Sequence, residues 1–383
     1  MKVVLTQANL TLKGGAERVV LKIAQHYDAP IYVAEYNKDT TFAEFEELDV
    51  NVITKGEKYA KSRATQGLKY GLSFLNYKIE EDYDVINAHI APSHWIRKLN
   101  DRVLWYCHTP LREIYDLYKY RQSLRPIYKR PFYALGATAV KWIDKKVVNN
   151  IEYIFANSEN TKSRIVKYYG RTDAEVLNGC VEVERYRNEG DDNYFFYPSR
   201  FSPNKRQLYT VEAFNIFKKK YKKSNYKLVL AGAVSKDPFY YDYYVKVKER
   251  AQRVGDIEIL EDVDDERLLD LYSKCTAVLY TPVNEDYGLV PLEGMASGKP
   301  IIAVNEGGPK ETVEDKKTGY LINSEKEMAD KMLAFAYDKD LAEQLGKNGL
   351  KRVRKYYSWD HFFEVFDKAL YRVSKNKENE DIE

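Results

Sequence analysis

Cysteine is scarce in this sequence: Cys107, Cys180 and Cys275 stand far apart among 383 residues. An odd number with no CxxC pair excludes a disulfide framework and the usual zinc-site spacing, and it fits a reducing compartment. Long apolar runs are also missing, since no stretch approaches the roughly 18 residues of a membrane span. The N-terminal MKVVLTQANL is typical of a first strand and not of a signal peptide. We therefore expect a cytoplasmic protein.

A strong net charge is absent as well, because the formal charge is only +3. That balance gives no reason to expect nucleic acid as a partner. Histidine is rare, with five residues, and His89 and His94 in AHIAPSH have no evident third ligand. No metal site is predicted on this basis.

The sequence does contain a regular alternation of strand and helix patterns. KVVLTQ is followed by the amphipathic AERVVLKIAQHY, and YDVINAH, RVLWYCH and EYIFANS are typical of buried strands. The alternation restarts after the polar stretch VERYRNEGDDN, residues 183–193. This pattern predicts an α/β fold with two Rossmann-like doubly wound domains, residues 1–185 and 192–356. We expect a C-terminal helix over 357–375 to pack back on the first domain and residues 376–383 to be disordered.

The stretch NEDYGLVPLEGMASGKP, residues 284–300, follows the strand pattern AVLYTPV. Ligands of open α/β sheets gather at the carboxyl ends of strands. Gly288 permits a close turn there, and Pro291 suits the first turn of a helix, which predicts a helix start near residues 287–289. The N–H groups of Gly288, Leu289 and Val290 would then face a phosphate or a sugar oxygen.

Two glutamates flank that turn. Glu285 lies on the loop beside it, and Glu293 is expected one to two turns into the helix, where its carboxylate can accept hydrogen bonds from a ribose diol. The alternative is that acids simply favour a helix N-terminus. That alternative would cover Glu285 but not Glu293.

A second pattern is the cationic turn PSRFSPNKR. Arg200 closes a strand pattern and Lys205 follows five residues later, so the pair can neutralise a diphosphate. Solvated surface cations are the alternative.

Gly14 and Gly15 follow the first strand and open the first helix, as a phosphate-approach turn would. They do not form the GxGxxG dinucleotide fingerprint, and a plain tight turn is the alternative. His108 ends the strand pattern WYC, where it can contact a substrate hydroxyl or move a proton; a structural histidine is the alternative. Asp262-Val263-Asp264 looks like a DxD metal motif, but capping of the next helix by Asp264 or Asp265 is the favoured role.

The segment from Leu111 to Lys146 departs from the rest, with nine basic and three acidic residues and seven interleaved aromatics. Basic residues with Tyr and Trp suit an anionic membrane surface. The alternative is a solvated helix pair whose aromatic residues face the core. The cations proposed to face a membrane or an acceptor are Arg112, Arg121, Arg125, Lys129 and Arg130.

Together these residues resemble the GT-B glycosyltransferases of family 4, the retaining group 1 enzymes. The resemblance covers almost the whole chain and is strongest in the E-x7-E motif with GMASGKPIIAVNEGGPKETV, then in SRFSPNKR, the Gly-Gly turn and HTP. It implies a donor cleft between two Rossmann-like domains. The implied roles are diphosphate binding by Arg200 and Lys205, sugar binding by Glu285 and His108, ribose binding by Glu293, phosphate or sugar approach at Gly15, and base contact near Val263.

The resemblance also implies the reaction. A hexose, with mannose the first choice, would pass from a nucleotide-diphosphate sugar to a glycan or lipid-linked acceptor at the cytoplasmic membrane face. GDP-mannose is the first choice of donor and a UDP-hexose the alternative, and no metal or cofactor is expected. A sugar-nucleotide epimerase and a non-catalytic glycan-binding module at the membrane surface are the competing functions.

Overall fold

The computed structural model describes residues 1–54, 63–123, 125–222 and 225–375. The chain divides into two compact units, one of residues 1–178 together with the residues from Phe363 onward, the other of residues 179–362. The predicted linker, residues 183–193, therefore lies within the second unit. The predicted disordered tail, residues 376–383, lies outside the described residues.

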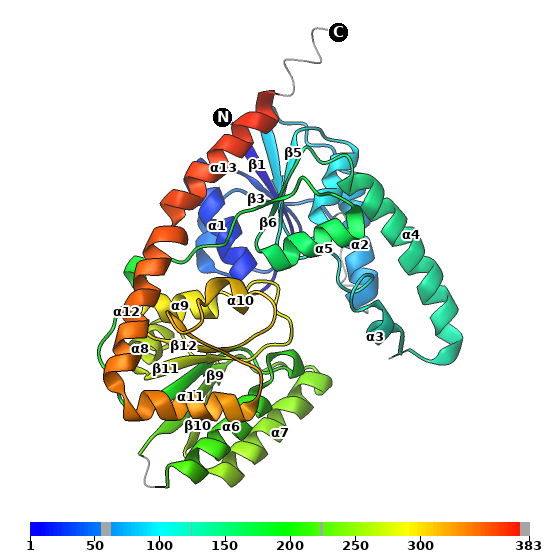
Figure 1. Cartoon of the computed structure of the whole chain (residues 1–383). Coiled ribbons are helices and arrows are strands. Elements are labelled where there is room, and N and C mark those ends of the chain that lie inside the picture. The colour runs from blue at the N-terminus through cyan, green and yellow to red at the C-terminus, as the bar shows by residue number, and fades with distance from the viewer. Residues whose placement is uncertain (55–62, 124, 223–224, 376–383) are drawn as a thin grey trace. The chain divides into compact units, whose positions relative to one another are not determined.

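The first unit contains a seven-stranded parallel sheet in the order β3-β2-β1-β4-β5-β6-β7 (Figure 1). The strands predicted at KVVLTQ, YDVINAH, RVLWYCH and EYIFANS are confirmed as β1, β4, β5 and β6. The strands are β1 (Val3–Leu10), β2 (Ile31–Tyr36), β3 (Val50–Val52), β4 (Val85–Ala88), β5 (Val103–Cys107), β6 (Tyr153–Ala156) and β7 (Glu175–Val176).

Helices cover both faces of this sheet. One face packs against α2, the short helix η2, α4 and α5 through a single apolar cluster. On the other face, His26 at the end of α1 stacks on Phe363 of α13 at 3.7 Å, and Tyr27 Oη donates to Asp367 Oδ1 at 2.6 Å. The helices are α1 (Gly15–Tyr27), η1 (Ala43–Glu47), α2 (Arg63–Leu75), η2 (Ser93–Lys98), α3 (Tyr118–Ser123), η3 (Ile127–Lys129), α4 (Arg130–Val148), α5 (Glu159–Tyr169) and α13 (Trp359–Ser374).

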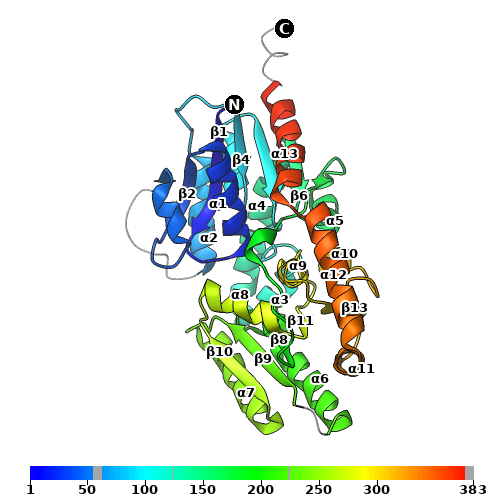
Figure 2. The same ribbon diagram turned by 90° about the vertical axis from the view of Figure 1, so that its left-hand side faces the viewer.

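The second unit contains a six-stranded parallel sheet in the order β10-β9-β8-β11-β12-β13 (Figure 2). Its strands are β8 (Tyr194–Pro198), β9 (Lys227–Gly232), β10 (Ile257–Glu261), β11 (Ala277–Tyr280), β12 (Ile301–Val304) and β13 (Gly319–Ile322). Its helices are η4 (Val183–Arg185), η5 (Pro203–Lys205), α6 (Gln207–Lys220), α7 (Pro238–Val254), α8 (Asp265–Lys274), α9 (Val290–Ala296), α10 (Pro309–Thr312), α11 (Glu325–Tyr337) and α12 (Lys339–Tyr356).

The unbroken apolar run YFFYP of β8 is explained by burial on both faces. Phe195 and Tyr197 pack in a cluster with α6, α7 and α11, whereas Tyr194 and Phe196 pack in another with α8, α9 and α12. A parallel sheet covered on both faces needs apolar residues at successive positions. The α/β class with two Rossmann-like sheets is confirmed.

The strand order reverses once in each sheet, between β1 and β4 in the first and between β8 and β11 in the second. Ligands of doubly wound sheets bind outside the carboxyl ends of the strands at such a point. The loops that follow these four strands are therefore where a site is expected.

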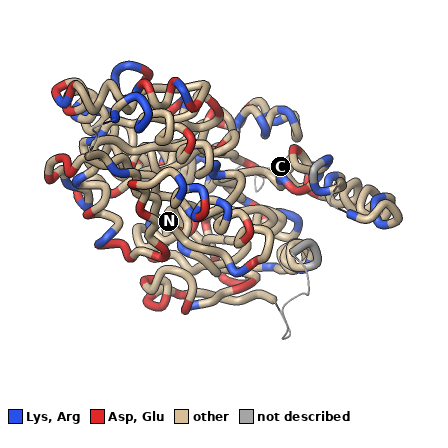
Figure 3. Tube along the Cα trace, turned by 90° about the horizontal axis from the view of Figure 1, so that it is seen from below, with Lys and Arg blue, Asp and Glu red and all other residues tan. Residues whose placement is uncertain are grey.

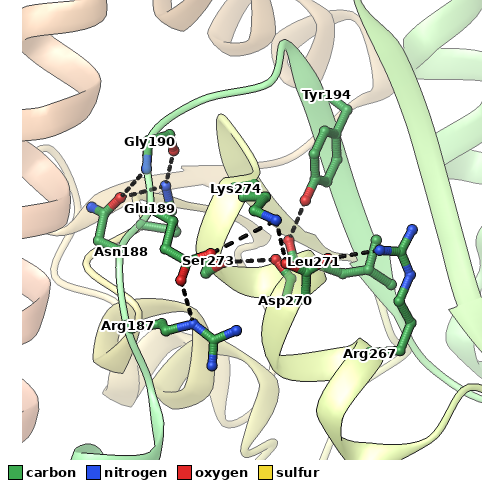
Figure 4. A network of polar contacts seen from close by, with 11 residues as sticks. Arg187, Asn188, Glu189, Gly190, Tyr194, Arg267, Asp270, Leu271, Ser273 and Lys274 are labelled. Atoms are coloured by element: carbon green, nitrogen blue, oxygen red, sulfur yellow. Dashed lines mark hydrogen bonds and ion pairs between the residues drawn. The ribbon is translucent and has the colours of Figure 1, made fainter.

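The polar stretch before β8 is fixed to the surface of the second unit (Figure 4). Arg187 Nε donates to Glu189 Oε1 at 2.7 Å, and Ser273 Oγ of α8 donates to Glu189 Oε2 at 3.2 Å. The Glu189 N–H also donates to the Ser273 carbonyl at 2.9 Å. Lys274 Nζ of α8 also lies 3.7 Å from Glu189 Oε2, so both hydrogen bonds and an ion pair hold the stretch to α8.

Candidate active site

Three loops meet at the switch point of the second unit, after β8, β11 and β12. The Val283 N–H donates to the Asn204 carbonyl at 2.8 Å, which joins the first two loops. The Gly308 N–H donates to the Glu285 carbonyl at 2.9 Å, which joins the second and third. The loops that carry Arg200, Lys205 and Glu285 therefore form one connected edge.

Two glycines that the sequence analysis did not single out allow this approach. A Cβ on Gly308 would lie 2.1 Å from the carbonyl oxygen of Tyr287, and one on Gly307, where φ is +59°, would lie 2.4 Å from that of Glu285. No larger side chain fits either position without moving the loop. The signal was present in the sequence, since NEGGP directly follows the β12 pattern.

Helix α9 begins at Val290, later than predicted. Leu289 is its N-cap, and Pro291 stands in the first turn as expected. Gly288 lies before the helix with a left-handed φ of +87°, a conformation that interrupts helical geometry, so its N–H is not a helix-terminal group. Glu293 consequently stands in the first turn and not one to two turns into the helix. The preference of acids for a helix N-terminus therefore covers Glu293, whereas Glu285 precedes the helix.

Lys205 and Glu285 form the central ion pair of this edge. Lys205 Nζ lies 2.6 Å from Glu285 Oε2, and the two side chains are 16% and 26% exposed. The same ammonium lies 5.7 Å from the centroid of the Tyr280 ring at the end of β11. The structure thus brings together two residues that were predicted on separate loops.

Tyr280 lies in the middle of the predicted donor-binding residues. Burial, and next the charge of Glu285, raise the pKa of Tyr280, Glu293 raises it further, and Arg200 lowers it. A Cβ on Gly288 would lie 2.8 Å from the Tyr280 ring. The charges of Glu285, Glu293 and Arg200 therefore all act on the buried phenol of Tyr280. Tyr280 was not among the residues predicted from the sequence.

A second tyrosine holds the other glutamate. Tyr272 Oη of α8 donates to Glu293 Oε2 at 2.6 Å. Burial, followed by the Glu293 charge, raises the pKa of Tyr272 well above its usual range. The phenol therefore stays protonated and orients one carboxylate oxygen. α8 also has Asp264 as its N-cap, accepting from the Arg267 N–H at 2.8 Å, which confirms the predicted capping role next to Val263.

The predicted residues of the first unit lie at the carboxyl edge of its own sheet. Gly14 is the N-cap of α1, and Gly15 is its first residue. The buried Glu17 carboxylate turns back toward this N-terminus, because a Cβ on Gly14 would lie 2.5 Å from its Oε2. A phosphate bound at the Gly14–Gly15 turn would therefore lie close to the Glu17 carboxylate.

His108 follows β5 and is 9% exposed. Its Nε2 lies 3.1 Å from Nδ1 of His89, which directly follows the neighbouring strand β4. His94 instead lies 2.9 Å from Asp144 Oδ1. Within the part of the chain that the structure describes, no group of three or more His, Cys, Asp or Glu side chains could hold a metal ion.

Two doubly wound units, one with clustered cations and carboxylates at its switch point, define the chain as a glycosyltransferase of the GT-B class. The chain belongs to the family 4 glycosyltransferases. The family model described as Glycosyltransferase Family 4 matches residues 13–185, and the one described as Glycosyl transferases group 1 matches residues 182–352.

Curated relatives agree with this assignment, and solved structures share the fold. Human alpha-1,3/1,6-mannosyltransferase ALG2 is 25% identical over 400 residues, covering 94% of this chain and 92% of its own. An uncharacterized glycosyltransferase of Methanocaldococcus jannaschii is 26% identical, covering 76% and 78%. Among solved structures, Anabaena HepE in complex with UDP and glucose has a TM-score of 0.74 at 17% identity, covering 97% and 99%.

Proposed function

We propose that this enzyme transfers mannose from a nucleotide-diphosphate sugar to a lipid-linked glycan with retention of anomeric configuration. The observation that carries the proposal is the Lys205–Glu285 pair beside Arg200 and Tyr280 at the switch point of the second unit. The mannosyltransferase names of the relatives support the choice of sugar. GDP-mannose is the proposed donor, and a UDP-hexose is the alternative.

The chemistry follows from the charges at this edge. The bond between the anomeric carbon and the diphosphate breaks, and its electron pair leaves with the diphosphate. Lys205 and Arg200 stabilise that negative charge, and Glu285 binds the transferred sugar. The acceptor oxygen forms the new glycosidic bond, and its proton passes to the departing diphosphate. These groups need no metal, so we propose a metal-independent enzyme.

Calorimetric titration with GDP, UDP and ADP tests the donor site. We expect one nucleotide to bind in the micromolar range, with the same affinity when EDTA is present. Loss of binding in EDTA would contradict the metal-independent proposal. NMR of the donor sugar without acceptor tests the competing function, because epimerisation there would favour a sugar-nucleotide epimerase.

Glu293→Gln should weaken binding of the preferred nucleoside diphosphate by about tenfold, since a charged acceptor is lost from the ribose hydroxyls. Tyr272→Phe should have a smaller effect of the same sign, because it frees the carboxylate but keeps its charge. Titration calorimetry measures both variants. An unchanged affinity of Glu293→Gln would refute the ribose role.

We further propose that the exposed face of α4 binds an anionic membrane surface, where the enzyme encounters its acceptor. Phe132, Leu135 and Trp142 repeat at helical spacing on this helix and are 78%, 73% and 66% exposed. Its other face is buried at Ala137 and Asp144. The preceding η3 adds Ile127 and Tyr128, also strongly exposed. Such an amphipathic helix lies in the plane of a membrane interface.

The predicted membrane cations divide into two kinds. Arg112 pairs with Asp116 at 2.8 Å, and Arg121 pairs with Glu113. Arg125 stacks on the Tyr133 ring at 3.8 Å, and Arg130 Nε donates to the Arg125 carbonyl at 3.1 Å. Arg112 and Arg121 therefore order the segment before α3, and Arg125 and Arg130 order the turn between α3 and α4. Lys129 on the same turn is exposed and lies beside the apolar face. Elsewhere in the described part of the chain, Lys and Arg are interspersed with Asp and Glu (Figure 3).

Among the described residues, no helix combines the length and hydropathy needed to cross a bilayer.

Phe132→Ser with Leu135→Ser should reduce binding to phosphatidylserine vesicles about tenfold or more, because the variant lacks two of the apolar side chains that would be buried in the membrane interface. Lys129→Glu should also weaken vesicle binding, and the loss should be larger at low salt than at high salt, because salt screens the charge. Vesicle cosedimentation measures both effects.

Leu68→Ser with Leu72→Ser is the matched control, since both leucines are 48% exposed on α2 of the same unit. We expect these changes to leave vesicle binding unaltered. Equal loss in both pairs would contradict a specific role for α4.

A further inference from the structure

A line of hydrogen bonds connects the interior of the first sheet to His108. Asn87 Nδ2 donates to the Leu104 carbonyl at 3.2 Å. Asn87 Oδ1 lies 2.7 Å from His89 Nε2, and His89 Nδ1 lies 3.1 Å from His108 Nε2. Asn87 and His89 are fully buried. The line begins inside the sheet and ends at the predicted sugar-contacting histidine.

The orientation of the Asn87 amide is set by the backbone. Because the Leu104 carbonyl can only accept, the amide nitrogen must face it. The amide oxygen then faces His89 and can only accept a hydrogen bond. His89 Nε2 must therefore carry a proton.

The remaining protons follow from this constraint. A neutral His89 that is protonated on Nε2 has an unprotonated Nδ1, which accepts. His108 Nε2 must then donate to it, so His108 is also protonated on Nε2. Its Nδ1 is left as an acceptor, and no described protein group hydrogen-bonds to that atom. Burial keeps the pair neutral, since it lowers the pKa of His108 to about 3 and that of His89 well below its usual value.

The backbone of His89 is fixed as firmly as its ring. Its N–H donates to the Thr6 carbonyl of β1 at 2.9 Å, and its carbonyl accepts from Trp105 Nε1 of β5 at 2.9 Å. Strands on both sides therefore hold the imidazole at one position. With the ring held in this way, the tautomer of His89 determines which nitrogen of His108 carries the proton.

We propose that Asn87 and His89 are positioning residues that fix the tautomer of His108, so that its Nδ1 accepts a hydrogen bond from a hydroxyl of the transferred sugar. The inference rests on the proposed function for the identity of the ligand. The tautomer itself does not depend on that function. An acceptor at this point selects a sugar that presents a hydroxyl there and rejects a donor that lacks one.

Nitrogen-15 NMR of the histidine-labelled chain tests the tautomers directly. The sequence has only five histidines, so single His→Gln variants suffice to assign the signals. We expect His89 and His108 both to be protonated on Nε2 in the wild-type chain between pH 6 and 8. A His108 protonated on Nδ1 would overturn the proposal, whether or not the chain transfers a sugar.

Asn87→Leu tests the direction of control. Without the amide oxygen, a proton on His89 Nε2 would be buried without an acceptor, so both rings should switch to the Nδ1–H form. The donor-sugar KM should then rise about tenfold, with the affinity for the sugar-free nucleoside diphosphate unchanged. Equal weakening of both affinities, or an unswitched His108 in a folded variant, would overturn the positioning role. Failure of transfer with every donor, with tautomers as expected, would refute the proposed function alone.

Discussion

Replacing Lys205 with alanine is expected to lower turnover about 10²–10³-fold, the usual cost of removing one preorganised group from a developing negative charge. The ammonium lies 2.6 Å from Glu285 in a largely buried setting, so its charge is poorly screened by water. Its removal also leaves the Glu285 carboxylate beside the departing diphosphate, where like charges repel. Steady-state kinetics at saturating donor measure the effect.

A double-mutant cycle separates these two contributions. Lys205→Ala with Glu285→Gln should lose less than the sum of the single changes, because the second change removes the unpaired charge that the first creates. Lys220→Ala is the matched control, since Lys220 forms an exposed ion pair with Asp330 in the same unit, and its turnover should stay near wild type. Near-wild-type turnover of Lys205→Ala would show that the diphosphate is held elsewhere.

Arg200 is exposed, and its charge acts on the Tyr280 phenol. Adding Arg200→Ala to Lys205→Ala should reduce turnover by roughly another tenfold or more, because both cations proposed to bind the diphosphate are then removed. If the double variant matched Lys205→Ala, Arg200 would have no part in the reaction.

The second large effect is expected on stability, at Asp144 of α4. This carboxylate is completely buried and accepts four hydrogen bonds from distant parts of the first unit. The donors are His94 Nε2 at 2.9 Å, Trp95 Nε1 at 2.7 Å, Tyr115 Oη at 3.1 Å and Tyr169 Oη at 2.8 Å. Asp144→Ala leaves all four without this partner and should destabilise the first unit by about 3–5 kcal/mol.

For a unit of this size the loss corresponds to a Tm lower by roughly 6–20 °C. Thermal and urea unfolding measure it. Asp144→Asn is the matched control: it keeps one acceptor oxygen for His94 and Trp95, so its loss should be intermediate. A change of under 1 kcal/mol in Asp144→Ala would contradict the central role of this carboxylate. Because Asp144 anchors α4, the same variant should also weaken vesicle binding.

Several features of this protein were determined by the sequence alone. The apolar runs predicted β1, β4, β5 and β6 of the first sheet and β8 and β11 of the second, because a parallel strand buried on two faces has little choice of residue. The strands β2, β3, β7 and β13 were not predicted. The cap at Asp264 and the proline in the first turn of α9 were equally local, since each depends on a few neighbouring residues. The loops that carry Arg200, Lys205 and Glu285 were predicted in the same way, as polar segments after strands.

Only the tertiary structure decided which of these groups meet. Lys205 and Glu285 are 80 positions apart, and His94 and Asp144 are 50 apart. Tyr272, which orients Glu293, belongs to the preceding helix, and Gly308, which receives the Glu285 loop, follows the next strand. Periodicity in a sequence reports which face of an element is buried, but it carries no information about which strand becomes its neighbour. The order of the strands in each parallel sheet makes that choice, and it thereby places the cation, the carboxylates and the two tyrosines around one edge.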